Sequence, residues 1–184
     1  MGPAVTRWVA LLRGINVGGS NRLAMADLRV MFKVLGLLNP TTYIQSGNVV
    51  FDAADDLDEL TLGEMIASGL ADQHRLRVSV VLRTATAIGR IAAAHPDADS
   101  GLEPKLLHIM FLDRAPSGAV LGELDPARYE PDGWTIDDRE VYVRYPTGPA
   151  HSKLTIDVFE RALDVTATAR NLNTVRKLAE LADG

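Results

Sequence analysis

The sequence predicts a protein of the α+β class, and two observations lead to this fold. Residues 8–83 alternate between short β-rich runs and helical patterns in the order β-α-β-β-α-β. Residues 105–182 begin the same order again, with no sequence identity between the halves. This order is that of the split βαβ, or ferredoxin-like, unit. We therefore expect two ferredoxin-like units in tandem, the second incomplete and ending in an extra C-terminal helix.

The sequence pattern of residues 8–83 predicts a complete ferredoxin-like unit. A short apolar run, WVALLRG, ends at a glycine and is typical of a buried strand. Apolar residues at helical spacing follow, and Gly36 and Pro40 would end that helix. Two β-rich runs joined at Gly47 indicate a tight hairpin. The six expected elements, with antiparallel strands in the order 4-1-3-2, cover residues 8–14, 25–38, 41–46, 48–52, 57–75 and 77–83.

The second half predicts a β-α-β-β-α order, with a final helix where a fourth strand would be expected. A connecting helix over 84–94 and the polar loop HPDADSG lead into it, so we expect domains at residues 1–94 and 95–184. The expected elements are a strand, a short helix, a hairpin and two helices, over 105–112, 117–124, 134–137 with 140–145, 152–164 and 171–182.

The composition of the chain disfavours several classes of partner and site. The chain has 184 residues, 47% of them hydrophobic, and a net charge of −5, which disfavours a nucleic-acid partner. It has no cysteine, no run of ~20 apolar residues and no signal-peptide layout, so we expect a cytoplasmic protein without a membrane partner. The four histidines lack metal-ligand spacing, so no metal site is expected. No nucleophile–base pair or carboxylate dyad is evident, and the sequence identifies neither a catalytic residue nor a cofactor.

Three motifs resemble a known family. LLRGINVGG, YIQSGNVVF and the late R-N-x-N-T are similar to the signatures of the domain of unknown function 1697 family, found mainly in bacteria. The resemblance runs from about Val5 to Leu181. Lysine often follows the double glycine in that family, and tryptophan often stands inside R-N-x-N-T, where this chain has Ser20 and Leu172. The resemblance implies the fold and a bacterial cytoplasmic setting, but no catalytic residues.

The glycine-rich stretch after the first strand is the main candidate site. In the predicted topology, this loop and the hairpin turn lie at the same end of the sheet. Backbone amides, a hydroxyl and a guanidinium would then face a glycine-lined gap, which suits an anionic or hydrogen-bonding ligand. The alternative is that the glycines only permit turns. The candidate ligand-binding residues are Arg13, Gly14, Asn16, Gly18, Gly19, Gln45, Ser46, Gly47 and Asn48.

A second candidate site lies near the C-terminus, where a helix N-terminus and an arginine could bind an anion. Asn171 could instead cap the last helix. The residues are Ser152, Lys153, Arg170 and Asn171.

The leading hypothesis is a binding protein, with catalysis left open, for a small polar or anionic ligand such as a nucleotide or a sugar phosphate. One alternative is an RNA- or DNA-binding module, which the net charge and the 5% aromatic content disfavour. Another is a protein–protein interaction adaptor that uses the sheet edges or the final helix. The oligomeric state does not follow from the sequence.

Overall fold

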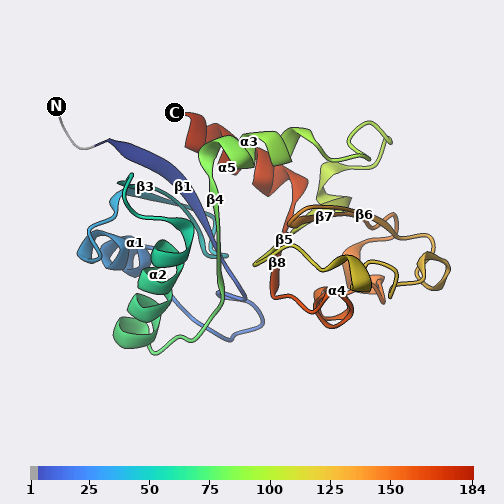
Figure 1. The fold of residues 1–184 in the computed structure, drawn as a ribbon, viewed down its shortest axis with the longest axis horizontal. Helices are drawn as coiled ribbons and strands as arrows, with labels where there is room; N and C mark the ends of the chain where they lie inside the picture. Colours follow the sequence, from blue (N-terminus) through green and yellow to red (C-terminus); the bar gives the residue numbers. More distant parts are fainter. Residues whose placement is uncertain (1–3) are drawn as a thin grey trace. The chain divides into compact units, whose positions relative to one another are not determined.

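The computed structural model describes residues 4–184 and contains two compact units. The first unit comprises the chain up to Gly89 together with Leu178–Gly184, and the second comprises Arg90–Lys177. Each unit holds a four-stranded antiparallel sheet, so the protein is of the α+β class (Figure 1).

The first sheet has the strand order β2-β3-β1-β4, which is the expected order 4-1-3-2. Its strands are β1 (Val5–Leu12), β2 (Leu38–Tyr43), β3 (Asn48–Ala54) and β4 (Val80–Thr84). Helices α1 (Met25–Val34) and α2 (Glu59–His74) cover one face of this sheet (Figure 1), and α3 (Ala85–Ala93) follows β4.

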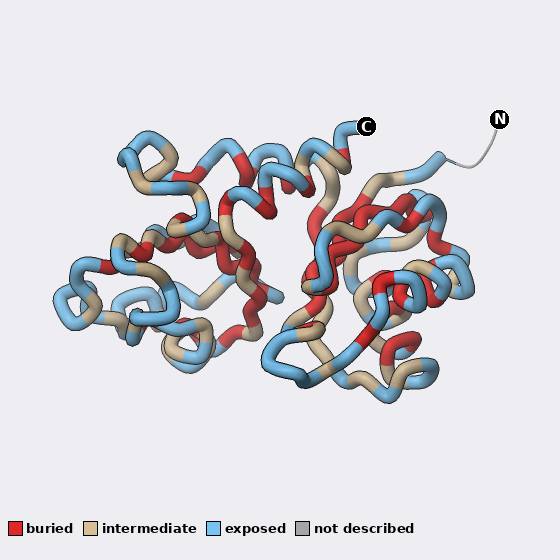
Figure 2. Tube along the Cα trace, turned by 180° about the vertical axis from the view of Figure 1, so that it is seen from behind, coloured by how far each residue is buried: buried red, intermediate tan, exposed pale blue. Residues whose placement is uncertain are grey.

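The core of the first unit forms between this face and the two helices, and strands β1, β3 and β4 are buried along most of their length, whereas β2 is mostly exposed or half-buried (Figure 2). Alternate residues of β1 point into it, among them Trp8, Ala10 and Leu12, as the period of two in a strand requires. Phe32 of α1 meets Phe51 of β3 edge to face, with ring centroids 5.1 Å apart.

Several boundaries in the first unit differ from the prediction, and two of these differences shape the end of the sheet. Helix α1 ends at Val34 instead of residue 38, because Gly36 adopts a positive φ of 79° and the chain turns into β2. The predicted run 41–46 stops at Tyr43, which pairs with Asn48, so residues 44–47 form a four-residue turn. The side-chain amide of Asn48 holds this turn by donating to Tyr43 O at 3.1 Å and Ser46 Oγ at 3.0 Å.

The second sheet has the order β6-β7-β5-β8. Its strands are β5 (Leu107–Leu112), β6 (Gly133–Asp137), β7 (Glu140–Arg144) and β8 (Ala167–Asn171), and its core includes residues of α4 (Ile156–Leu163). Trp134 and Phe159 pack there edge to face at 5.8 Å. Helix α5 (Leu172–Asp183) ends the chain.

The expectation that the second unit lacks a fourth strand was wrong, because β8 supplies that strand between α4 and α5. It pairs antiparallel with β5 from His108↔Asn171 to Leu112↔Ala167. The predicted helix over 117–124 is only a short 3-10 helix, Gly118–Val120. The predicted helix over 152–164 begins at Ile156, so Ser152 and Lys153 precede it.

Candidate functional site

The loop after β1 and the β2–β3 turn lie together at one end of the first sheet. Antiparallel pairing of Leu11 with Asn48 places both segments beyond the same strand ends. Two hydrogen bonds join them directly. Leu12 N donates to Gly47 O at 2.9 Å, and Asn16 Nδ2 donates to Gln45 O at 2.8 Å. The shared end expected from the sequence is therefore present.

Asn16 organises this end through its side chain. Besides Gln45 O, its Nδ2 donates to Leu23 O at 2.8 Å, and its Oδ1 accepts from Leu23 N at 2.9 Å. A second asparagine closes the base of the loop, since Asn21 Nδ2 donates to Gly14 O at 3.2 Å. These bonds hold residues 14–23 as one folded loop against the turn.

A pocket of about 460 Å³ opens at this end. This volume falls within the range of small-molecule sites. Of the expected residues, Asn16, Gly19 and Gln45 line it, and the other three lining residues, Arg22, Leu23 and Ala24, were not predicted from the sequence. Arg22 is the only charged residue of the six.

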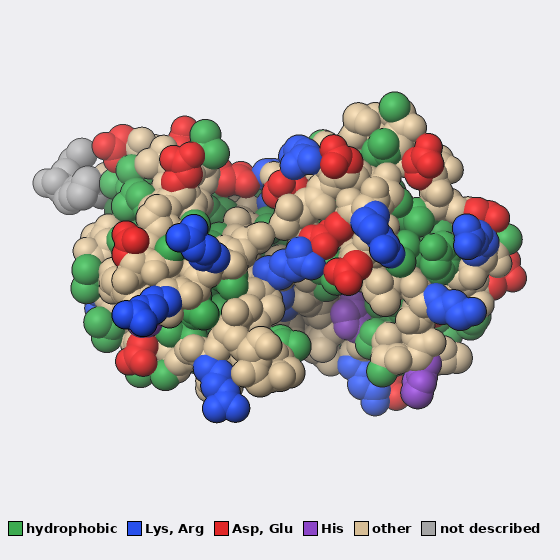
Figure 3. Space-filling model, turned by 90° about the horizontal axis from the view of Figure 1, so that it is seen from below, with side chains coloured by type: hydrophobic (Ala, Val, Ile, Leu, Met, Phe, Trp, Pro, Cys, Tyr) green, Lys and Arg blue, Asp and Glu red, His purple; other side chains and the backbone are tan. Residues whose placement is uncertain are grey.

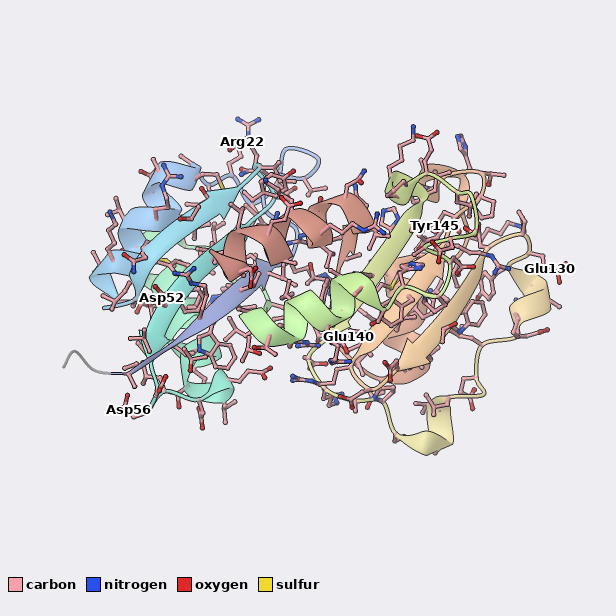
Figure 4. All side chains as sticks on the ribbon, turned by 90° about the horizontal axis from the view of Figure 1, so that it is seen from above. Arg22, Asp52, Asp56, Glu130, Glu140 and Tyr145 are labelled. Carbon is pink, nitrogen blue, oxygen red and sulfur yellow. The ribbon has the colours of Figure 1, made fainter. Side chains whose placement is uncertain are left out.

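Arg22 gives the pocket its positive charge. Its Nη2 lies 4.0 Å from the position that a Cβ on Gly19 would occupy, so the guanidinium lies close to Gly19. The side chain extends outward from the loop that precedes α1 (Figure 4). Its place between the glycines and the helical pattern was the signal in the sequence that could have identified it.

The same loop also carries backbone donors. Within residues 4–184, the N–H groups of Gly18 and Gly19 donate no hydrogen bond, and both residues are exposed with positive φ. Ala24, which lines the pocket, is the N-cap of α1 and makes no side-chain capping bond. The first N–H groups of a helix lack intrahelical acceptors and carry partial positive charge, so they favour an anion at this end.

Two of the other predicted residues, Gly47 and Asn48, have structural roles. Gly47 is buried with a φ of 74°, and a Cβ there would lie 2.9 Å from Leu12 Cβ and from Ile15 Cγ1. Asn48 is fully buried, and its amide reaches Ser46 Oγ inside the turn, as described above. Arg13 is half-buried after β1, where its N–H donates to Ser79 O at 2.9 Å.

The C-terminal candidates are held by bonds of their own. Ser152 Oγ donates to Asp132 Oδ2 at 2.6 Å, and exposed Lys153 follows it. Asn171 Oδ1 accepts from Thr174 N at 2.9 Å, which is the capping role considered for it. Arg170 donates to Thr168 Oγ1 at 2.8 Å, and burial lowers its pKa to about 10.

Within residues 4–184, no group of three or more His, Cys, Asp or Glu side chains could hold a metal ion. Nor does any helix in this range have the length and apolar character needed to cross a membrane. On the face drawn in Figure 3, lysine and arginine side chains alternate with aspartate and glutamate instead of forming a continuous basic stripe.

Comparison with known proteins gives a family but no activity. The model of a family described as "Protein of unknown function (DUF1697)" matches residues 5–142. A solved structure, that of the conserved bacterial protein SP0830 from Streptococcus pneumoniae, is similar in fold, with a TM-score of 0.70 and 21% sequence identity. The match covers 98% of this chain and 100% of that one. No curated protein matches the chain.

Proposed function

The chain belongs to the DUF1697 family, described as proteins of unknown function, and we propose that the pocket beside α1 binds a small polar or anionic ligand, a nucleotide or a sugar phosphate. The proposal rests on three kinds of donor in the lining of one pocket. These are the Arg22 guanidinium, the backbone N–H group of Gly19, and the N-terminus of α1, where Ala24 is the N-cap.

Each donor suits the same chemistry. A guanidinium binds phosphate or carboxylate oxygens in a bidentate geometry, and backbone N–H groups add short hydrogen bonds at little cost in entropy. Because no acidic side chain lines the pocket, nothing in the lining opposes a negative charge. The loop lacks the Gly-Lys-Ser/Thr ending of a P-loop, so the proposed site is a different arrangement of the same kinds of donor.

Arg13 is a second proposed anion contact, because it follows β1 at the same end of the sheet. We also propose that the two halves are ferredoxin-like units in tandem, as the element order β-α-β-β-α-β of the first half suggests. We do not extend the ligand proposal to the C-terminal residues, because Ser152 and Asn171 are engaged in bonds within the protein.

Isothermal titration calorimetry with inorganic phosphate, ribose 5-phosphate and adenosine monophosphate tests the proposal. Arg22→Ala removes a charge-assisted hydrogen bond, which costs roughly 1.5–3 kcal/mol, so the dissociation constant should rise about ten- to a hundredfold. Arg13→Ala should weaken binding in the same direction, with thermal melting to show that the fold is retained.

Lys33→Ala is the control. Lys33 is an exposed cation in the last turn of α1, whereas the pocket lies at the first turn. Arg29 is unsuitable, because its Nη1 donates to Thr42 Oγ1 at 2.6 Å. If none of the three anions binds, or if wild type and Arg22→Ala bind equally well, the proposal is wrong.

A further inference from the structure

His95 is the one buried residue of the loop that follows α3. Of residues 94–103, all of which lie in the described part of the chain, His95 alone is buried, with 4% of its surface exposed. Hydrogen bonds inside the loop hold its shape, since Ala98 N donates to His95 O at 3.0 Å and Ser100 Oγ donates to Asp97 O at 2.7 Å. His95 is therefore the main anchor of this loop on the rest of the second unit.

The ring of His95 packs against β7. It meets the ring of Tyr142 edge to face, with the two centroids 5.4 Å apart. Its Nδ1 accepts a hydrogen bond from Asp97 N at 3.2 Å, so this nitrogen carries no proton in the folded protein. Protonation would turn Nδ1 from an acceptor into a donor that faces another N–H group. The bond that orients the ring within its loop therefore exists only while the ring is neutral.

The charged groups near the ring do not favour a proton there. Burial lowers the pKa of His95; backbone groups and the carboxylate of Asp97 offset part of this effect, and the charge of Arg176 on α5 adds to it. The carboxylate of Asp97 is shared, because its Oδ1 lies 3.5 Å from Arg144 Nη1. A protonated His95 would thus be buried between a carboxylate that already has a cation and a second cation.

The other titratable groups on the strands beside the ring supply no further negative charge to balance it. Burial raises the pKa of Tyr142 to about 12 and lowers that of His108, on β5, to about 4, so both are uncharged at neutral pH. Glu140, on the same face of β7 as Tyr142, is paired with Arg90 at 3.9 Å. The surroundings of His95 therefore fit its neutral form.

We propose that His95 is a pH-sensitive anchor, which holds the loop 94–103 on the second unit while its ring is neutral and releases the loop when the ring is protonated. The switch is confined to the second unit and does not depend on the ligand proposed above. A histidine in water has a pKa of about 6.5, so the released loop takes up a proton below that pH. The equilibrium constant for opening should then rise by up to about tenfold per pH unit.

Hydrogen exchange of the backbone amides, followed by NMR at about pH 7.5 and about pH 5 and corrected for intrinsic exchange rates, tests the proposal. The amides of Asp97 and Ala98 donate bonds inside the loop, and their protection should fall about tenfold between these pH values. The amides of β5 and β7 should be better protected than the loop at both pH values, because the sheet stays folded when the loop opens.

Two variants remove the titrating group while each keeps one of its contacts. His95→Phe keeps an aromatic ring against Tyr142, and His95→Asn keeps an acceptor for the N–H group two residues further on. In both variants the protection of the loop should no longer depend on pH. The matched control is His151→Asn, which replaces an exposed histidine of the same unit and should leave the pH dependence unchanged.

Three results would overturn the inference. The first is a wild-type loop that is equally protected at both pH values, and the second is a pH dependence that survives in both His95→Phe and His95→Asn. The third is exchange of loop and sheet amides at one common rate, because the loop would then open only when the whole unit unfolds. His108→Asn should keep the response of the loop, and its loss in that variant would assign the response to His108 instead.

Discussion

Asn16 should contribute more to the stability of the first unit than any exposed polar residue, because its side chain makes three hydrogen bonds. Two of them, to and from Leu23, are partly buried, and the third, to Gln45 O, is exposed. A net hydrogen bond contributes about 0.5–1.5 kcal/mol, and water can replace the exposed one. Asn16→Gly, which tolerates the native φ of 55°, should therefore lower the free energy of unfolding by about 1–3 kcal/mol.

Asn16→Ala should lose about 1 kcal/mol more than Asn16→Gly, because alanine is strained at positive φ. Asn16→Asp should be the least stable of the three at neutral pH, since a carboxylate oxygen would then face the carbonyls of Leu23 and Gln45. Urea denaturation followed by circular dichroism measures all three. Gln73→Ala, an exposed amide on α2, is the control and should lie within about 0.5 kcal/mol of wild type. An Asn16→Gly variant as stable as that control would show that the hydrogen bonds of Asn16 do not stabilise the first unit.

Three further predictions concern stability. Gly47→Ala should lower the free energy of unfolding by about 2–4 kcal/mol in urea denaturation, because the new Cβ would lie 2.9 Å from neighbouring side chains and φ is positive. Gly18→Ala, which has open space around it, should lower it by about 1 kcal/mol. The Arg7 hydrogen bonds hold the pKa of Asp52 below its usual range, so the ionised carboxylate stabilises the folded protein. This stabilisation is present above the unfolded pKa of about 3.9 and is lost as the pH falls through the folded pKa. Asp52→Asn should therefore show a shallower loss of stability in acid. Burial lowers the pKa of His108 to about 4, so the unfolded chain binds a proton at this residue more readily than the folded protein does. The free energy of unfolding should therefore fall as the pH drops from about 6.5 to about 4. His108→Asn should reduce this loss.

Each of these predictions has an outcome that would contradict it. Equal destabilisation by Gly47→Ala and Gly18→Ala would show that the close approach at Gly47 is relieved at no cost. Identical acid unfolding curves for wild type and Asp52→Asn would show that Arg7 does not stabilise the carboxylate. An NMR titration that finds His108 protonated near pH 6.5 would show that its ring is hydrated in solution.

The sheet end of the first unit was predictable because topology alone determines it. Antiparallel order forces the loop after β1 and the β2–β3 turn to the same end, whatever the loops do in detail. The role of Asn16 was not predictable in the same way. Its bonds to Leu23 and Gln45 depend on the path of two irregular segments, and periodicity carries no information about such paths.

Strand β8 could not be predicted from the sequence, for a different reason. Its residues, ATARN, include no large apolar or aromatic side chain, so they lack the composition that marks a strand. The strand forms because β5 offers a free edge to which it pairs over five residues. Here tertiary pairing outweighs local propensity, and the sequence pattern predicted only the helix that follows.

The charged residue at the pocket could not be predicted from the sequence either. Sequence reasoning chose Arg13, next to the strand, as the cation of the site. Arg22 lines the pocket instead, because the loop folds back on itself through the bonds of Asn16 and Asn21 and brings the start of α1 to the glycines. Predicting that reversal requires the loop conformation, which five closely spaced glycine and asparagine residues leave open.

We propose that the end of the first sheet, between residues 14–24 and 44–47, binds a small anion. A ¹H–¹⁵N NMR titration with ribose 5-phosphate tests it most directly, because it reports on each backbone N–H separately. We expect saturable shifts of the amides of Gly18, Gly19, Arg22 and Gln45, and we expect Arg22→Ala to abolish them. Shifts confined to other residues, or unchanged shifts in Arg22→Ala, would contradict it.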